Sequence, residues 1–194
     1  MNEIRDDDGD RDSAVLARVA AGDMAAMRAL YTEHADAVQR FVRTRLRDEF
    51  EAADIVHETM LSVWRGAKSF ERRSSARSWI LSIARNKVID FVRKQARVSL
   101  AEPDETTPDE DPDAEAVIAA AEDARHVRGC VEKLSDRQRA VVHLAFFEDL
   151  DYPEIAAIEG VPEGTVKTRI FHAKKLLMRC LSRPLEKVRP IEKD

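Results

Sequence analysis

The sequence YPEIAAIEGVPEGTVKTRIFHAKKLLMRCLS, residues 152–182, has the pattern of a short helix, a tight turn and a longer helix. Apolar positions between Tyr152 and Ile158 predict the short helix. Gly160 is suited to end it and Pro162 to begin the next, because the first turn of a helix does not need the missing N–H. The stretch therefore predicts a helix-turn-helix, in which the second helix enters the major groove of DNA.

The second helix of this unit has two different faces. Its predicted buried stripe follows the spacing i, i+4, i+7 and i+11, and consists of Val166, Ile170, Ala173 and Leu177. The opposite face is predicted to reach base edges through Thr165, Thr168, Arg169 and His172. The side chains expected to meet phosphates are Lys167, Lys174 and Lys175. A basic face alone is usually only solvated, but the preceding helix and turn favour DNA binding.

The charge of the 194-residue chain is unevenly distributed along the sequence. A net charge of -5 disfavours DNA binding, but 14 of the 37 acidic residues lie in segments 1–12 and 101–115. Without these segments the chain has 30 basic against 23 acidic side chains, and residues 65–97 alone have ten against two. The overall acidity therefore conceals two basic surfaces, which a nucleic-acid-binding protein requires.

The predicted fold class is all-α, with two small helical domains joined by a flexible acidic linker. Three prolines, eight acids and no apolar side chain larger than alanine in residues 101–115 predict the linker, because such a segment cannot bury enough surface to fold. The predicted units are an acidic disordered tail, a helical bundle, the linker, a helix-turn-helix domain and a C-terminal tail, at residues 1–12, 13–98, 99–121, 122–183 and 184–194.

Helical periodicity without strand alternation supports this division. In the first domain, Asp23 and Asp54 are predicted N-caps, and a fourth helix is expected near residues 75–97. In the second domain, helices are expected at 122–134 and 136–147, with Ser135 or Asp136 capping the latter.

The helix predicted near 75–97 has a polar stripe that its packing does not explain. Its members are Ser82, Asn86, Arg93 and Arg97, flanked by Arg85 and Lys94. Asparagine is a poor helix former, and its amide can read an adenine or an unpaired base. Aromatic side chains can stack on exposed bases. Trp79 shares the apolar stripe of Ile83 and is assigned to the core, whereas the role of Phe70, in a loop, is left open.

Three segments together resemble the extracytoplasmic-function (ECF) sigma factors, two-domain specificity subunits of bacterial RNA polymerase in the sigma-70 family. The segments are DIVHETMLSVWRGA (54–67), FERRSSARSWILSIARNKVIDFVRKQAR (70–97) and VPEGTVKTRIFHAKKLL (161–177). The resemblance extends from about residue 13 to residue 182. The order of the three segments and their spacing around an acidic linker make the resemblance specific.

The resemblance implies roles for particular residues. Residues 13–98 would form sigma region 2, which docks on the clamp helices of the polymerase through Asp54, Val56, His57, Glu58, Leu61 and Trp64. His57 stands where the family usually has glutamine. The same domain would melt and read the -10 element through Phe70, Arg77, Ser82, Arg85, Asn86, Lys87 and Arg93. Residues 122–183 would form region 4, which reads the -35 element with the basic helix described above.

The implied function is a sigma factor that binds core RNA polymerase through its clamp helices and flap, recognises both promoter elements, promotes strand opening and directs initiation. Bases captured from the non-template strand would offset an unstacking cost of a few kcal/mol each. The family resemblance further implies a stress-response regulon under an anti-sigma factor. A bacterial cytoplasmic protein, monomeric outside these complexes and without a cofactor, is expected.

Other classes of protein fit the sequence less well. Scattered histidines and the absence of a phosphate-binding glycine loop or nucleophile elbow argue against an enzyme. His126 and Cys130 have a metal-ligand spacing, but two ligands do not make a zinc site. Cys130 and Cys180 lie far apart without a CxxC pair, so no disulfide is predicted, in keeping with a reducing cytoplasm. The sequence also shows neither a signal peptide nor a membrane span.

Two alternatives within DNA-linked regulation also remain. A dimeric helix-turn-helix regulator would explain residues 152–182, but its dimerisation domain would not need the basic residues of 65–97. A decoy that only binds an anti-sigma partner, as sigma-like domains fused to receiver domains do, would require a receiver domain for which the chain is too short.

Overall fold

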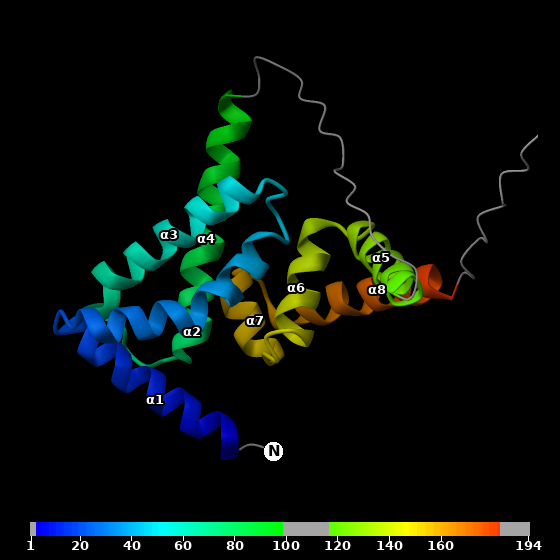
Figure 1. Cartoon of the computed structure of the whole chain (residues 1–194). Helices are drawn as coiled ribbons and strands as arrows, with labels where there is room; N and C mark the ends of the chain where they lie inside the picture. The colour runs from blue at the N-terminus through cyan, green and yellow to red at the C-terminus, as the bar shows by residue number, and fades with distance from the viewer. Residues whose placement is uncertain (1–2, 99–116, 183–194) are drawn as a thin grey trace, which may run out of the picture.

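The computed structural model describes residues 3–98 and 117–182, and these ranges contain helices but no strand. The elements are α1 (Glu3–Ala20), α2 (Met24–Val42), α3 (Glu49–Gly66), the 3-10 helix η1 (Ala67–Ser69), α4 (Ala76–Val98), α5 (Val117–Glu132), α6 (Asp136–Phe146), α7 (Tyr152–Glu159) and α8 (Glu163–Leu181). The predicted all-α fold class is confirmed. Helices α1–α4, the N-terminal domain, lie beside α5–α8, the C-terminal domain (Figure 1).

Side-chain caps define where the helices of the N-terminal domain begin. Asp23 accepts hydrogen bonds from the backbone N–H groups of Ala25 and Ala26, as predicted for the N-cap of α2. The predicted cap at Asp54 is wrong, because α3 begins at Glu49 and is capped by Asp48. The first turn of α3 carries the exposed Phe50 between two glutamates, so it does not continue the buried apolar periodicity of the helix.

The helix-turn-helix is formed by α7 and α8. Asp151 and Glu154 form a reciprocal capping box at the start of α7, and Gly160 ends the helix in the left-handed conformation at φ 61°. Pro162 precedes the first residue of α8. The predicted cap of α6 is also confirmed, since Ser135 and Gln138 form a second capping box. Local sequence therefore determines the turn that orients α8 relative to α7.

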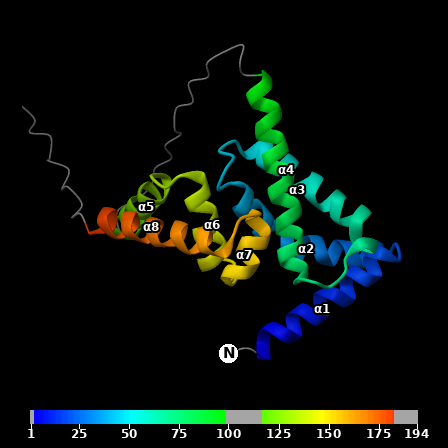
Figure 2. The same ribbon diagram turned by 180° about the vertical axis from the view of Figure 1, so that it is seen from behind.

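One continuous apolar core joins the two domains. Its largest fully buried side chains include Phe41, Leu30 and Ile80 from α2 and α4, and Leu144 and Ile155 from α6 and α7. Burying an apolar side chain of this size stabilises a fold by about 1.5–3 kcal/mol. The two domains therefore pack together, with α7 against α4 and α6 near α2 (Figure 2). A smaller cluster of Leu134, Val142 and Ala173, with Leu177 against it, holds α8 to α5 and α6.

Two predicted boundaries are wrong. Helix α1 begins at Glu3, so residues 3–12 are helical and not a disordered tail. Helix α5 begins at Val117, so residues 117–121 belong to a helix and not to the linker. Each residue added to an existing helix gains one hydrogen bond without a new nucleation cost. Polar turns can therefore extend a helix beyond its packed segment. The rest of the predicted linker, 99–116, and the predicted tail, 184–194, lie outside the described residues.

A disulfide joins Cys130, at the end of α5, to Cys180, at the end of α8. The prediction of no disulfide is therefore wrong. The pairing follows from the packing of α5 against α8, which a sequence separation of 50 residues does not reveal. Cys130 also lies 4.0 Å from the Nε2 atom of His126, its predicted partner in a two-residue metal candidate. None of the described helices has the length and apolar character needed to cross a membrane.

Candidate nucleic-acid interface

Helix α8 presents the face that the sequence predicts. Val166, Ile170 and Ala173 are buried and Leu177 is half-buried, which confirms the apolar stripe. On the opposite side, Thr168, His172 and the three lysines of α8 are exposed, and Thr165 is half-buried. Arg169 differs from them, because its side chain is only 18% exposed and its Nη1 atom lies 3.7 Å from a carboxylate oxygen of Glu159.

Contacts along α8 occupy part of this polar face. Lys167 pairs with Glu163 one turn earlier at 2.7 Å, and this hydrogen bond raises the pKa of the lysine. The Lys174 ammonium lies 5.2 Å from the centroid of the Phe146 ring. Thr168 donates its hydroxyl hydrogen to the carbonyl of Gly164. Despite these contacts, the exposed side chains of α8 form a basic surface, which also includes Lys175 and His172.

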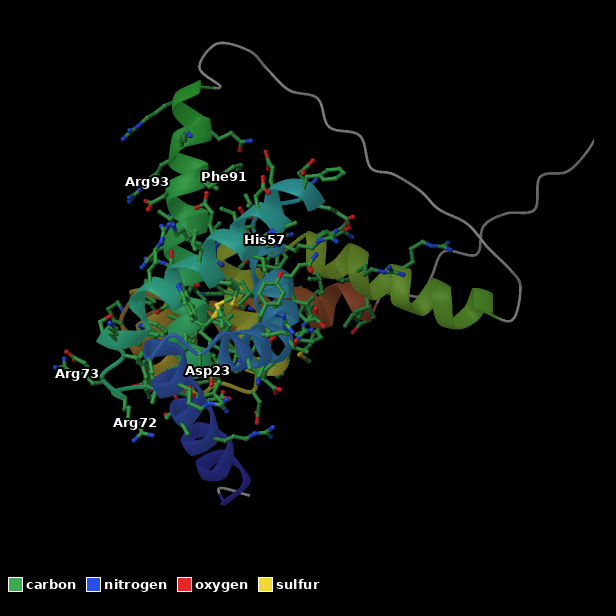
Figure 3. The ribbon with its side chains drawn as sticks, turned by 60° about the vertical axis from the view of Figure 1, so that its left-hand side comes forward. Asp23, His57, Arg72, Arg73, Phe91 and Arg93 are labelled. Carbon is green, nitrogen blue, oxygen red and sulfur yellow. A yellow bond between two sulfur atoms is a disulfide. The ribbon has the colours of Figure 1, made fainter. Side chains whose placement is uncertain are left out.

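Helix α4 carries the second predicted surface. Asn86 is exposed, and its Oδ1 atom accepts a hydrogen bond of 3.1 Å from Arg85. Lys87 pairs at 3.3 Å with Glu58 of α3, and the Ser82 hydroxyl donates to the carbonyl of Trp79. Arg93 extends into solvent from the C-terminal half of the helix (Figure 3). Of the predicted -10 residues on α4, Asn86, Lys87 and Arg93 therefore lie where a nucleic acid can reach them.

Phe70, whose role the sequence left open, packs against the core. Its ring centroid lies 5.2 Å from that of Trp79, and both rings are partly buried against the core. Trp79 is therefore a core residue, as predicted, and Phe70 packs on it. The loop that follows Phe70 exposes Arg72 and Arg73, which extend away from the domain (Figure 3). The sequence reasoning did not select these two arginines.

The predicted polymerase-docking face lies on α3. Asp54, His57, Glu58 and Leu61 are all exposed, as their spacing of i, i+3, i+4 and i+7 on one helix face requires. Trp64 is half-buried, but Val56 is only 4% exposed and belongs to the core, so its assignment to this surface is wrong. Sequence reasoning also missed Phe50, which is 84% exposed at the start of α3.

Acidic residues of the C-terminal domain hold two of the predicted -10 arginines. Arg77 and Arg40 pair with Glu148, whose side chain is 0% exposed. Arg85 donates a hydrogen bond of 2.7 Å to the backbone carbonyl of Glu159. The sequence reasoning missed both glutamates. The available signal was Glu159 itself, a charged residue one turn after Ile155 on the apolar stripe of α7.

Glu148 makes the stability of this arrangement depend on pH. Burial alone raises the pKa of its carboxyl group, but the hydrogen bond with His143 and the charges of Arg77, His143 and Arg40 hold the pKa below the usual 4.5. A carboxyl whose pKa is lower in the folded chain stabilises the fold above its unfolded pKa. We expect this contribution to be complete above about pH 5 and to be lost as the pH falls through the folded pKa.

Thermal melting of the wild type and of Glu148→Gln, from about pH 7 down to about pH 3, checks this expectation. The melting temperature of the wild type should exceed that of the variant near neutral pH, and this difference should disappear in acid. A difference between the two melting temperatures that stays constant over this range would contradict it.

Comparisons with known proteins match both domains to one family. Residues 30–98 match the family described as Sigma-70 region 2, and residues 125–177 match Sigma-70, region 4. The ECF RNA polymerase sigma factor SigL of Mycobacterium tuberculosis is 33% identical over 178 residues, covering 86% of this chain and 96% of that protein. The ECF RNA polymerase sigma factor RpoE of Cereibacter sphaeroides is 34% identical over 163 residues, covering 82% of this chain and 88% of that protein.

Solved structures show the same fold. CnrH, in a complex with the cytosolic domain of CnrY, superposes with a TM-score of 0.62 at 25% identity and covers 88% of this chain and 96% of its own. The sigma factor RpoE of Bartonella quintana, solved with the anti-sigma factor NepR, has a TM-score of 0.63 at 22% identity and covers 81% of this chain and 98% of its own. With regions 2 and 4 in order and relatives matched over nearly their whole length, the chain belongs to the ECF sigma factors of the sigma-70 family.

Proposed function

We propose that α3 docks this sigma factor on core RNA polymerase while α4 and α8 read the two promoter elements. The observation that carries the proposal is the placement of three separate surfaces. The exposed α3 face, the exposed C-terminal half of α4 and the basic face of α8 belong to different helices, and the buried side chains of each helix anchor it in the apolar core. One molecule therefore carries a separate surface for the polymerase and for each of the two promoter elements.

The α3 face has the chemistry of a protein interface. It combines the apolar Leu61, 47% exposed, with the carboxylates of Asp54 and Glu58 and with His57, which stacks on Tyr31 at 6.3 Å. Such a mixed apolar and charged surface suits docking on the clamp helices of the large subunit. The flap is the expected partner of the C-terminal domain.

Run-off transcription with core polymerase tests the proposal, with start sites mapped across genomic DNA. The protein alone should bind promoter DNA weakly, and the reconstituted holoenzyme should initiate from defined sites. Leu61→Ala should weaken core binding, whereas Val92→Ala, a similarly exposed apolar side chain on α4, should not. The absence of any sigma-dependent transcript would contradict the proposal.

Arg169→Ala should weaken -35 recognition by about five- to 150-fold, the equivalent of roughly 1–3 kcal/mol for a good base contact. Loss of one cationic contact should also lower the salt dependence of DNA binding. Fluorescence anisotropy with duplex promoter DNA measures both quantities. Arg137→Ala, which removes the same charge from the exposed start of α6, is the matched control. Unchanged occupancy in the Arg169 variant would mean that the DNA-reading face of α8 is assigned incorrectly.

We also propose that the protein acts in the bacterial cytoplasm under an anti-sigma factor that covers its polymerase-binding surfaces. The complex of RpoE with NepR supports this regulation by analogy of fold. A stress-response regulon is the corresponding expectation.

A further inference from the structure

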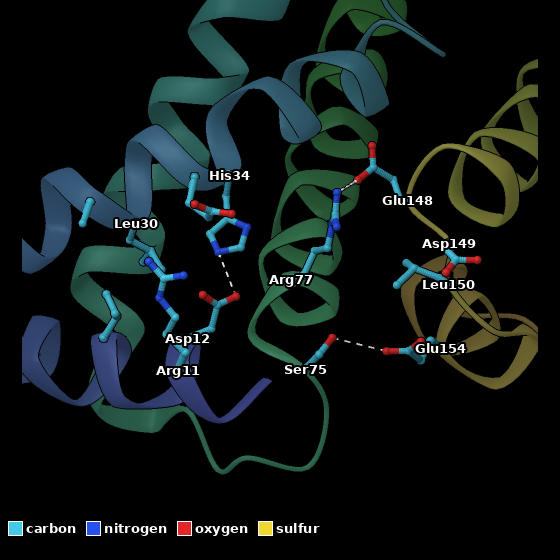
Figure 4. Close-up of a pocket in the computed structure, with 13 residues that line it drawn as sticks. Arg11, Asp12, Leu30, His34, Ser75, Arg77, Glu148, Asp149, Leu150 and Glu154 are labelled. Carbon is cyan, nitrogen blue, oxygen red and sulfur yellow. Dashed lines mark hydrogen bonds and ion pairs between the residues drawn. The ribbon is translucent and has the colours of Figure 1, made fainter. Parts of the chain in front are cut away.

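We propose that the cavity between α1, α2 and the turn from α6 to α7 binds a linear polyamine (Figure 4). The cavity has a volume of about 440 Å³, which falls in the range of roughly 300–1,000 Å³ that small-molecule sites occupy. Among the described residues, Arg77 is the one predicted DNA-binding residue that lines it, and Glu148 already holds this arginine. Ligand binding here would therefore not depend on the proposed function.

The walls of the cavity carry an excess of negative charge. Five acidic side chains line it, against two arginines. One acid, Glu148, is held by Arg77 and Arg40, so its carboxylate attracts a ligand little. Arg11, which is exposed, is the other arginine. The other four carboxylates belong to Asp12, Glu33, Asp149 and Glu154. This balance of charge favours a cationic ligand over an anionic one.

His34 gives an independent reason to expect a hydrogen-bond donor in the cavity. Its side chain is 6% exposed, and its Nε2 atom has no hydrogen-bond partner among the described residues. The Oδ2 atom of Asp12 lies 3.2 Å from this nitrogen, but not in hydrogen-bond geometry (Figure 4). An unprotonated Nε2 atom and a carboxylate oxygen are both acceptors, whereas an ammonium group has three N–H donors. One ammonium group can therefore bind both atoms and satisfy the buried nitrogen.

The opposite side of the cavity provides a second pair of carboxylates. Glu154 accepts hydrogen bonds from the Ser75 and Ser78 hydroxyl groups, at 3.2 and 2.8 Å, and these bonds orient its carboxylate. Asp149 lies on the same side, in the turn that precedes α7 (Figure 4). A second ammonium group would form charge-assisted hydrogen bonds with these oxygens. The acceptors of the cavity are thus divided between its two sides.

A ligand that reaches both sides needs a positive charge at each end and an apolar segment between them. Leu30 and Leu150 contribute apolar lining on the two sides, where methylene groups can be buried (Figure 4). A linear polyamine has this chemistry. A metal ion fits less well, because no group of three or more His, Cys, Asp or Glu side chains in the described part of the chain could hold one.

Calorimetric titration of the full chain with spermidine tests the proposal, with n-butylamine and Mg²⁺ as comparison ligands at matched ionic strength. Spermidine should bind saturably at one site. The monoamine n-butylamine should bind about tenfold or more weakly, because a single ammonium group cannot engage both sides of the cavity. Equal affinity for the two amines, or a spermidine signal that Mg²⁺ reproduces, would overturn the proposal.

Two double variants that lose the same negative charge locate the site. Glu33→Gln with Asp149→Asn removes one carboxylate from each side of the cavity, and asparagine tolerates the left-handed backbone at position 149. The control, Asp36→Asn with Glu132→Gln, removes two exposed carboxylates that do not line the cavity. The cavity variant should bind spermidine about tenfold or more weakly than the control. An equal loss in both variants would show attraction by net charge alone and would overturn the proposal.

Thermal melting provides a second readout. A ligand that binds only the folded chain raises its melting temperature by mass action. Spermidine should therefore stabilise the wild type and the control more than the cavity variant. If the double cavity variant does not fold, Glu33→Gln alone should still weaken spermidine binding by about threefold or more, because it removes one exposed carboxylate from the cavity. An unchanged affinity in that variant would overturn the proposal.

Discussion

Asn86→Ala should lower open-complex formation by about five- to 150-fold, the equivalent of the roughly 1–3 kcal/mol that one specific base contact supplies. The amide is exposed on α4, and only the Arg85 guanidinium contacts it among the hydrogen bonds of the described residues. Alanine is a better helix former than asparagine, so the substitution should not weaken α4. Permanganate footprinting of melted promoter DNA measures the effect, and a pull-down measures core binding.

Gln95→Ala provides the matched control for this experiment. Gln95 is a second exposed amide on the same helix, and it donates to Glu51 of α3 at 2.9 Å. Its removal should leave open complexes at the wild-type level. If Asn86→Ala reduced core binding as strongly as it reduced melting, Asn86 would have a structural role and not a base-reading one.

Reduction of the Cys130–Cys180 disulfide should lower the free energy of unfolding by about 4 kcal/mol, because the bond closes a loop across a sequence separation of 50 residues. The bond ties the end of α5 to the end of α8, near the small cluster around Leu134 and Ala173. Urea unfolding with and without dithiothreitol measures the difference.

The double variant Cys130→Ser with Cys180→Ser is the control for the reductant. Its unfolding curve should not respond to dithiothreitol, and it should resemble that of the reduced wild type. Oxidised glutathione should restore the bond and the stability of the reduced wild type. Equal stability of the oxidised and reduced wild type would show that helix packing alone holds α5 to α8.

Short-range features of the fold could be predicted because they depend on neighbouring residues. The left-handed turn at Gly160 and the cap at Asp23 each involve backbone groups within a few positions. The buried stripe of α8 follows from helical spacing. The same local rules failed at Asp48 and at Glu3, where the helices begin several residues before the apolar periodicity that predicts them.

The sequence by itself determined the all-α class, the helix-turn-helix, the exposed face of α8 and the family resemblance, because residue type and local spacing encode them. Only the tertiary structure decided that Val56 is buried, that Phe70 packs on Trp79, and that Cys130 pairs with Cys180. It also decided that Glu148 and Glu159 hold arginines of the other domain. These contacts join residues dozens of positions apart, and their partners depend on how whole helices pack, which no local pattern specifies.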